Sequence, residues 1–261
     1  MALSSFGLVE RRLWLTAERH QTNSKLKVSE CFIPVLGIIF LAYADQMLAA
    51  AYRRTWRKAH QNEETMRYSA DITSGSLKVT ESRVIADLLL RRVSRKEWDQ
   101  ALYEDNALQT RSRETAKRFN RLIRRRLTSM EPDLWKLVRD GNGSTSTHAC
   151  LAAAVKCSFL LGDFLDLVVR NEYRAYSPTL SNKLWEDYLG DCRNRDPEMG
   201  DLSEATRDRL RSTVFQVLAQ AGYLENTRTL KLQTVHIDRQ VLAYLQGRDE
   251  KYVLKCIQVA P

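Results

Sequence analysis

The residues best able to do chemistry in this sequence are cations gathered in one short stretch. Residues 111–126, RSRETAKRFNRLIRRR, hold eight basic side chains and one acidic side chain, so they supply +7 of the chain's net charge of +9. Clustered Lys and Arg side chains attract anionic partners, of which nucleic acid is the commonest. The stretch therefore predicts a binding surface for a polyanion.

Apolar residues recur through this stretch at helical spacing, so residues 110–128 are predicted to form one amphipathic helix. Its apolar face consists of Ala116, Phe119, Leu122, Ile123 and Leu127. The opposite face carries a row of four cations, Arg113, Lys117, Arg121 and Arg124. One flank carries a second row, Arg111, Arg118 and Arg125. Arg126 falls towards the apolar face, where we expect it to pair with an internal acid or to bond a backbone carbonyl.

The row of four cations spans roughly 16 Å at about 1.5 Å per residue, a length that can follow several DNA phosphates. Like charges four residues apart destabilise a helix by about 0.2–0.5 kcal/mol per pair. Because the sequence keeps these charges, an anionic partner explains the row better than solvation alone. The alternative is a solvated face whose charge is balanced by acids from elsewhere in the fold.

A second, more dispersed group of cations lies near the C-terminus. Residues 201–204, DLSE, form a capping-box pattern that opens a helix ending before Gly222. Extended segments around a turn at residues 225–227 predict a small β-hairpin, and residues 252–259 a closing strand. This order is typical of a winged helix, which places a helix in a DNA groove and a hairpin on phosphates. The candidate DNA contacts are Arg207, Arg211, Arg228 and Lys231.

Helical patterns dominate the rest of the chain. Residues 94–97, SRKE, form a capping-box pattern, Pro132 suits the first turn of a helix, and residues 149–161 are apolar almost all round, as expected of a central buried helix. The fold is therefore predicted to be mainly α: a helical bundle with a C-terminal winged-helix-like module that carries a small β-hairpin. Three regions are expected. Residues 1–65 form an N-terminal helical extension, which a polar stretch over 53–65 separates from the body. Residues 66–195 form a helical domain with the basic helix, and residues 196–261 form the winged-helix-like module.

Catalytic signatures are absent from the sequence. It has no GxxxxGK[ST], GxGxxG or GxSxG motif, and its four His residues are scattered, with no HExxH motif. The two carboxylates Asp163 and Asp166 fit a helix start better than an acid–base pair. The five Cys residues include no CxxC spacing, which argues against a zinc module and for a reducing cytoplasm. We therefore expect a cytoplasmic protein that is not an enzyme and has no cofactor and no metal.

One apolar stretch, residues 31–44, bears on membrane insertion. It contains 14 uncharged residues, CFIPVLGIIFLAYA, before Asp45 interrupts it. A bilayer span needs about 20 mostly apolar residues. The stretch therefore predicts a buried helix, and a membrane partner is not expected.

Residues 66–261 resemble the BrxA family of BREX phage-defence systems. The resemblance is carried by ESRVIADLLL at 81–90, EW at 97–98, NALQTRSRETAKR at 106–118, EPDLW at 131–135, DG at 140–141, DF at 163–164 and AGYL at 221–224. It implies a small helical, non-enzymatic component that binds double-stranded DNA. It also implies a similarity to the NusB antitermination fold.

Residues 23–50, NSKLKVSECFIPVLGIIFLAYADQMLAA, look like a different family. They are similar to part of the N-terminal helical domain of type I restriction-modification methyltransferase subunits. The cofactor loop and the Asn-Pro-Pro-[Phe/Tyr] motif of those enzymes are absent, so this fragment cannot methylate. We interpret the extension over 1–65 as a fusion remnant or as the result of a start codon placed too far upstream.

The sequence thus favours a double-stranded DNA-binding accessory protein of bacterial BREX antiphage defence. Two alternatives stay open. One is a protein-interaction scaffold, in which the basic helix docks on an acidic BREX subunit. The other is an RNA-binding, antitermination-like protein, which the NusB similarity suggests. Other BREX subunits are candidate partners in each case.

Overall fold

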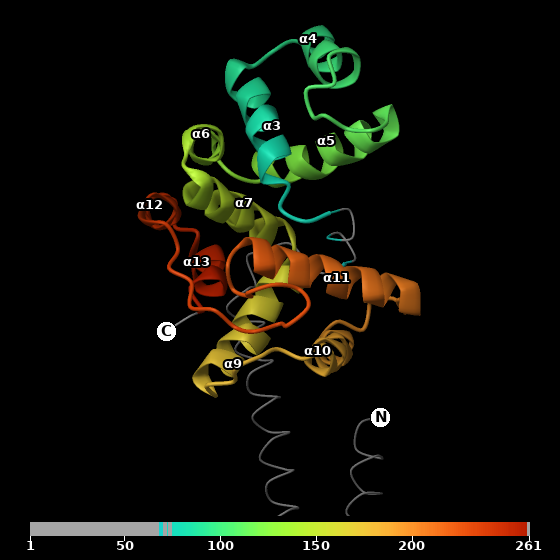
Figure 1. The fold of residues 1–261 in the computed structure, drawn as a ribbon, viewed down its shortest axis with the longest axis vertical. Coiled ribbons are helices and arrows are strands. Elements are labelled where there is room, and N and C mark those ends of the chain that lie inside the picture. Colours follow the sequence, from blue (N-terminus) through green and yellow to red (C-terminus); the bar gives the residue numbers. More distant parts are fainter. Residues whose placement is uncertain (1–67, 70–71, 73–74, 260–261) are drawn as a thin grey trace, which may run out of the picture. The chain divides into compact units, whose positions relative to one another are not determined.

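A computed structural model describes residues 68–69, 72 and 75–259 of the chain (Figure 1). The predicted N-terminal extension lies outside these residues. So do the apolar stretch at 31–44 and the fragment at 23–50 that looks like a methyltransferase. The described residues therefore belong to the body that follows the extension.

The described residues are mainly helical, which confirms the predicted class. In chain order the elements are α3 (Val79–Arg91), α4 (Arg95–Asp99), the π-helix η2 (Gln100–Glu104), α5 (Arg113–Thr128), α6 (Pro132–Asp140), α7 (Gly143–Cys157), α8 (Phe159–Asp163), the π-helix η3 (Phe164–Val169), α9 (Arg170–Arg174), α10 (Asn182–Arg195), α11 (Glu204–Gln220), α12 (Arg239–Gly247) and α13 (Lys251–Ile257). None of these helices is long and apolar enough to cross a membrane.

Short polar residues define where several helices begin. Ser94 forms the predicted capping box at α4, because its hydroxyl accepts from the Glu97 amide while the Glu97 carboxylate accepts from the Ser94 amide. Pro132 occupies the first turn of α6, as predicted. At α11 the N-cap is Ser203 and not Asp201, because the Ser203 hydroxyl accepts from the Thr206 amide. That helix therefore starts two residues later than the capping-box pattern indicated.

Helix α7 lies at the centre of the described body (Figure 1). Its residues 148–155 are all buried, in agreement with the buried helix predicted from the apolar pattern over 149–161. The helices that pack against it are α3, α5, α6, α8, α12 and α13. Three consecutive alanines, residues 152–154, let these neighbours approach closely. One hydrophobic core results, and it also includes Val214 of α11 and Val253 of α13.

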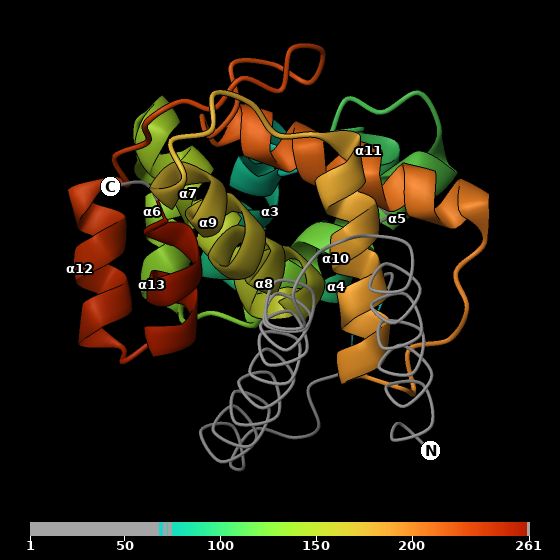
Figure 2. The same cartoon turned by 90° about the horizontal axis from the view of Figure 1, so that it is seen from below.

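The C-terminal region differs from the predicted strands. The described residues contain no β-sheet; two isolated antiparallel bridges join Leu224 to Leu232 and Thr179 to Lys231. The Leu232 amide donates to the carbonyl of Pro178, so the extended segment pairs partly with the chain before α10. Residues 252–259 were predicted as a strand, and this was wrong for most of the segment. They fall largely in α13, which packs beside α12 (Figure 2).

Helical spacing in the sequence explains the last difference. Val253, Cys256 and Ile257 are three and four residues apart, so they share one helix face, and all three are buried. An alternating strand would have divided them between two faces. The winged-helix module with its hairpin is therefore not confirmed by the described residues.

Asp163 and Asp166 both belong to buried polar clusters. Asp163 accepts hydrogen bonds from the hydroxyls of Tyr68 and Tyr252, and Arg195 lies 3.7 Å from it. Burial raises the pKa of the Asp163 carboxyl, although these partners oppose the shift. Asp166 pairs with Arg170 and Lys255. Because every one of these contacts joins helices or chain segments of the core, the two carboxylates act as structural residues.

Arg126 bonds backbone carbonyls, which is one of the two alternatives predicted for it. Its side chain is buried, and its guanidinium donates to the carbonyls of Ser76 at 2.7 Å and Gly75 at 3.0 Å. Hydrogen bonds from charged donors are stronger than neutral ones. Arg126 thus ties the segment before α3 to α5.

We expect Arg126→Met to lower the free energy of unfolding by about 2–4 kcal/mol, because two carbonyls lose their charged donor in a buried environment. Urea denaturation followed by circular dichroism measures this. Arg118→Met, on the exposed side of the same helix, is the matched control and should change stability by less than about 0.5 kcal/mol. Equal stability of the two variants would contradict the structural role of Arg126.

His148 of α7 is buried and links the helix to the start of α12. Its Nδ1 accepts a hydrogen bond from the Asp238 amide at 3.1 Å. Burial lowers the pKa of His148, while a hydrogen bond to the backbone of Ala221 and the charge of Asp238 oppose the shift. The folded protein therefore holds a neutral imidazole at this position.

A lowered folded-state pKa means that the unfolded chain binds a proton at His148 before the folded chain does. Stability should therefore fall as the pH drops below about 6.5, by at most about 1.4 kcal/mol per pH unit from this group. His148→Gln should reduce this fall between pH 7.5 and pH 5.5, measured by urea denaturation. The exposed His236→Gln is the control and should keep the wild-type dependence.

Candidate nucleic-acid interface

The basic helix forms as predicted, with its start at Arg113. Ser112 caps it by accepting from the Thr115 amide. Four of the five predicted apolar residues are buried, and Phe119 is half-buried against the core. Burial of this face against α3 and α7 turns the opposite face outward. The outward cations are all exposed: Arg111, Arg113, Lys117, Arg118, Arg121, Arg124 and Arg125.

Two of the four cations in the main row have acidic neighbours. Lys117 lies 2.8 Å from Glu114, and Arg113 lies 3.7 Å from Glu104 of η2. The hydrogen bond from Lys117 lowers the pKa of Glu114. Both pairs are exposed, so each contributes little to stability. Acidic side chains of the fold thus balance part of the positive charge of the row, as the alternative interpretation expected. A phosphate could displace the carboxylate in each of these pairs.

Aromatic side chains from α4 and η2 hold two cations of the row. The Arg124 guanidinium lies 4.9 Å from the centre of the Trp98 ring, and the Arg113 guanidinium lies 5.1 Å from that of Tyr103. Such cation–π contacts orient the planar guanidinium groups. Arg124 therefore has a defined position at the surface, between α5 and α4.

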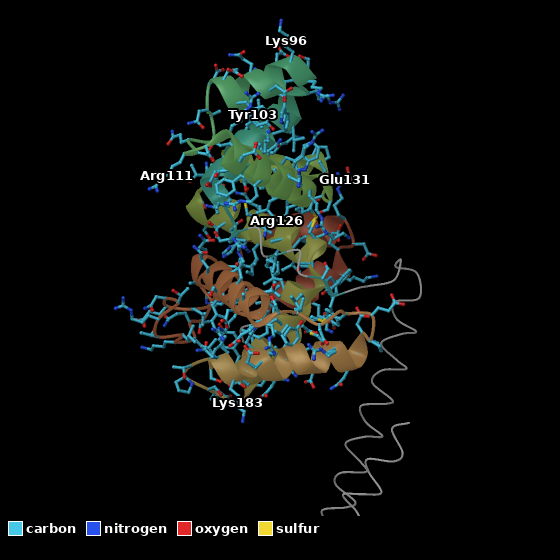
Figure 3. All side chains as sticks on the ribbon, turned by 90° about the vertical axis from the view of Figure 1, so that its right-hand side faces the viewer. Lys96, Tyr103, Arg111, Arg126, Glu131 and Lys183 are labelled. Atoms are coloured by element: carbon cyan, nitrogen blue, oxygen red, sulfur yellow. The ribbon has the colours of Figure 1, made fainter. Side chains whose placement is uncertain are left out.

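An open groove of about 730 Å³ separates α4 and η2 from α5. Five of its lining residues are cations and one is an acid. The lining residues are Arg95, Asp99, Tyr103, Lys117, Asn120, Arg121, Arg124, Arg125 and Thr128. Figure 3 shows Tyr103 and Arg111 in the part of the body that also carries Lys96, with Lys183 of α10 far from them. The groove combines a positive wall with polar groups able to donate and accept hydrogen bonds.

Five groove residues were missed by sequence reasoning: Arg95, Asp99, Tyr103, Asn120 and Thr128. The capping box at Ser94 located α4 but carried no information on which helix it faces. Asn120 lies on the predicted basic helix, so its position beside the cationic row followed from the sequence. Its role in the groove did not. Packing of η2 against α5 brings these residues together.

The C-terminal candidates are arranged differently. Arg211 is half-buried and pairs with Asp208 at 2.9 Å and Glu186 at 3.4 Å. Arg207 is half-buried on the same helix, while Arg228 and Lys231 are exposed in the segment after α11. None of these four lines the groove beside α5. The structure therefore gathers the basic helix with α4 and η2, and leaves the C-terminal cations as a separate group.

The structure describes four cysteines, all of them free thiols, and Cys157 is the half-buried one among them. Cys150, Cys192 and Cys256 are buried thiols. Burial raises the pKa of Cys150 to about 11, so its reactive thiolate form is disfavoured. Within the described ranges, no group of three or more His, Cys, Asp or Glu residues could hold a metal ion.

Fold and groove together define a class: a mainly helical protein with a cation-lined groove beside one basic helix. The BrxA family model matches residues 66–249, and the chain belongs to the BrxA family. A relative named BREX protein BrxA, from Paramagnetospirillum magneticum (strain ATCC 700264 / AMB-1), is 47% identical over 194 residues, which cover 74% of this chain and 98% of the relative. BREX protein BrxA of Escherichia coli O9:H4 (strain HS) is 28% identical over 188 residues, or 72% of this chain and 88% of that protein.

A solved structure is similar as well. It is the crystal structure of an uncharacterized protein from Magnetospirillum magneticum, with 46% sequence identity and a TM-score of 0.70. The similarity covers 75% of this chain and all of that chain. At this identity the agreement supports the helical arrangement described above.

Proposed function

We propose that this protein is a non-enzymatic double-stranded DNA-binding component of a BREX phage-defence system. Membership of the BrxA family supports the role in phage defence. The single observation that carries DNA binding is the exposed row of Arg113, Lys117, Arg121 and Arg124 along one face of α5. The row is straight because its members are three and four residues apart on one helix.

We expect the row to contact DNA phosphates and not to read the base sequence. The members of the row are all cations, and a cation binds a phosphate whatever base is attached to it. Each phosphate that a cation neutralises releases a condensed counterion, and affinity then falls with salt. The exposed pairs with Glu104 and Glu114 can exchange for phosphates at little cost. Binding should therefore depend on charge and only weakly on base sequence.

We also propose a winged-helix-like contact between the C-terminal region and DNA. Arg228 and Lys231 are exposed beside α11, where they can reach phosphates of a second DNA segment. Arg211 and Arg207 are less available because they are half-buried, and Arg211 already pairs with two acids. We therefore expect Arg228 and Lys231 to contribute more to binding than the two arginines of α11.

A protein-interaction scaffold is the second candidate. The pairs that Arg113 and Lys117 make with carboxylates favour it, because they show that this face accepts carboxylates as partners. An acidic surface of another BREX subunit could dock in the same way. Co-purification with BREX subunits after nuclease treatment, together with loss of DNA binding in pure protein, would favour the scaffold.

The double variant Arg121→Ala/Arg124→Ala tests DNA binding. If all four cations of the row reach phosphates, they alone give a log–log salt slope of about −3.6, at roughly −0.9 per contact. The double variant should make the slope shallower by about 1.8 and weaken all sequences alike. Gel shifts with random duplex DNA at several salt concentrations measure this, with single-stranded RNA as the competing ligand.

Lys183→Ala/Arg239→Ala is the matched control, because it removes the same charge from exposed positions outside the groove. It should leave the slope close to that of the wild type. Unchanged affinity of the Arg121/Arg124 variant would remove α5 from the interface. Unfolding of that variant would instead show that these arginines are structural.

A further inference from the structure

Two buried polar atoms, on residues that line the space between α4 and α5, have no hydrogen-bond partner among the described residues. One is Nε1 of Trp98, which is a donor, and the other is Oδ1 of Asn120, which is an acceptor. Trp98 is only 8% exposed. The Asn120 amide nitrogen does have a partner, because it donates to the Tyr103 hydroxyl at 3.4 Å. Buried polar groups are nearly always paired, so this donor and acceptor point to a ligand.

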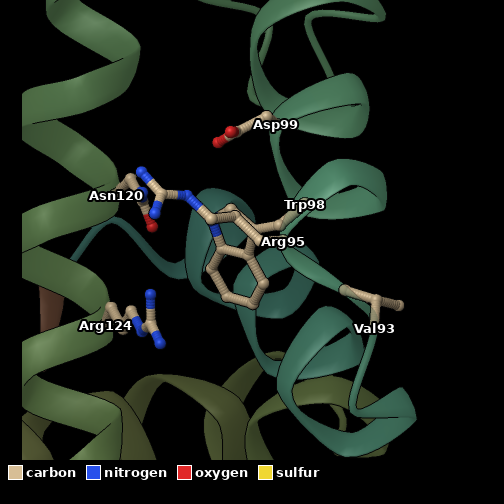
Figure 4. A pocket seen from close by; sticks show the side chains of 6 residues that line it. All are labelled: Val93, Arg95, Trp98, Asp99, Asn120 and Arg124. Atoms are coloured by element: carbon tan, nitrogen blue, oxygen red, sulfur yellow. The ribbon is translucent and has the colours of Figure 1, made fainter.

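Both atoms belong to residues that line one pocket of about 410 Å³. Figure 4 shows Asn120 and Arg124 projecting from α5 towards Arg95, Trp98 and Asp99 of α4. The volume lies within the range of roughly 300–1,000 Å³ that small-molecule pockets occupy. The pocket continues into the cationic groove, since Arg95, Asp99, Asn120 and Arg124 line both.

Arg124 offers a planar platform in this pocket. The Trp98 ring lies 4.9 Å from its guanidinium, and this cation–π contact restricts where the guanidinium lies. Guanidinium planes stack on nucleobases, and proteins use this contact for bases that have left the double-helical stack. Arg95 and Arg121 add positive charge beside the platform, where a phosphate attached to the same nucleotide would lie.

We propose that this pocket binds one unstacked nucleobase together with its 5′-phosphate. The base stacks on Arg124, its edge bonds Asn120 Oδ1 and Trp98 Nε1, and its phosphate lies near Arg95 and Arg121. The proposal rests on the proposed DNA-binding function, because neighbouring phosphates of the same strand would follow the α5 row. The edge of a base carries both donors and acceptors, and the residues that line the pocket hold one unpaired group of each kind. A free mononucleotide has the same chemistry and is the second possible source.

The experiment compares a fully paired duplex with the same duplex carrying one unpaired 2-aminopurine. We expect the wild-type protein to bind the duplex with the unpaired base about tenfold more tightly, which is the contribution expected of one stacked base. Binding should also change the fluorescence of 2-aminopurine. Trp98→Phe removes the N–H donor and keeps an aromatic ring, and Asn120→Ala removes the acceptor. Each should bring the ratio of the two affinities close to one. Arg124→Lys keeps the charge but loses the plane, so it should lower the ratio too.

Trp185→Phe is the matched control. Trp185 is a buried indole whose Nε1 also has no partner among the described residues, yet it does not line the pocket. This variant should keep the tenfold preference. If Trp185→Phe and Trp98→Phe reduce the preference equally, loss of a buried indole in general is responsible, and the pocket assignment is overturned.

Titration with dAMP separates the two sources. Preference for the unpaired base without measurable dAMP binding assigns the pocket to DNA, and dAMP binding that Asn120→Ala abolishes assigns it to free nucleotide. If the wild-type protein binds both duplexes equally and does not bind dAMP, the pocket proposal is wrong while DNA binding by α5 stands. If the wild-type protein binds neither duplex, the proposed DNA-binding function is wrong.

Discussion

Helix α7 has to be covered on every side, and the rest of the described structure depends on how that is achieved. Its residues 148–155 are buried all round, so it can exist only inside a shell of other helices. Helix α5 supplies part of that shell, and it has one apolar face to offer. Once that face is buried, the charged residues on the opposite face of α5 must point into solvent. The cationic row is thus a consequence of core packing.

The same helix shows how position decides what an arginine does. Arg126 lies on the buried side, where its guanidinium satisfies the carbonyls of Gly75 and Ser76. Arg124, two residues earlier, lies at the surface, where Trp98 orients it over a pocket. Because successive helix residues are rotated by 100°, a shift of two positions separates an arginine with a structural role from one at the surface that a ligand can reach.

The groove depends on a short element that contributes little to the core. Helix α4 has five residues, and among them Trp98 is the buried one. The Ser94 capping box and the π-helix η2 that follows hold this segment against α5. Polar groups of Trp98 and Asn120 stay unpaired among the described residues, as does Nε1 of Trp185, but Trp98 and Asn120 line one pocket and Trp185 does not, and the buried cluster around Asp163 is well paired. That contrast is the reason to regard the pocket as a binding site, whereas the carboxylates of α8 and η3 are structural.

Much of this could be predicted from local patterns. The basic helix, its apolar face, the inward turn of Arg126, the α4 capping box and the buried α7 all follow from spacing at 3.6 residues per turn and from cap chemistry, which depend on near neighbours in the chain. Other features depended on tertiary structure. Residues 252–259 form mostly helix because three apolar residues find a buried surface on one face, and propensity alone does not decide that. The groove joins Arg95 and Tyr103 to Arg121 and Arg124 across a contact between separate elements, and no local pattern records which helices become neighbours. The sequence by itself therefore determined the helices and the cations they carry, and only tertiary packing decided which cations share a site.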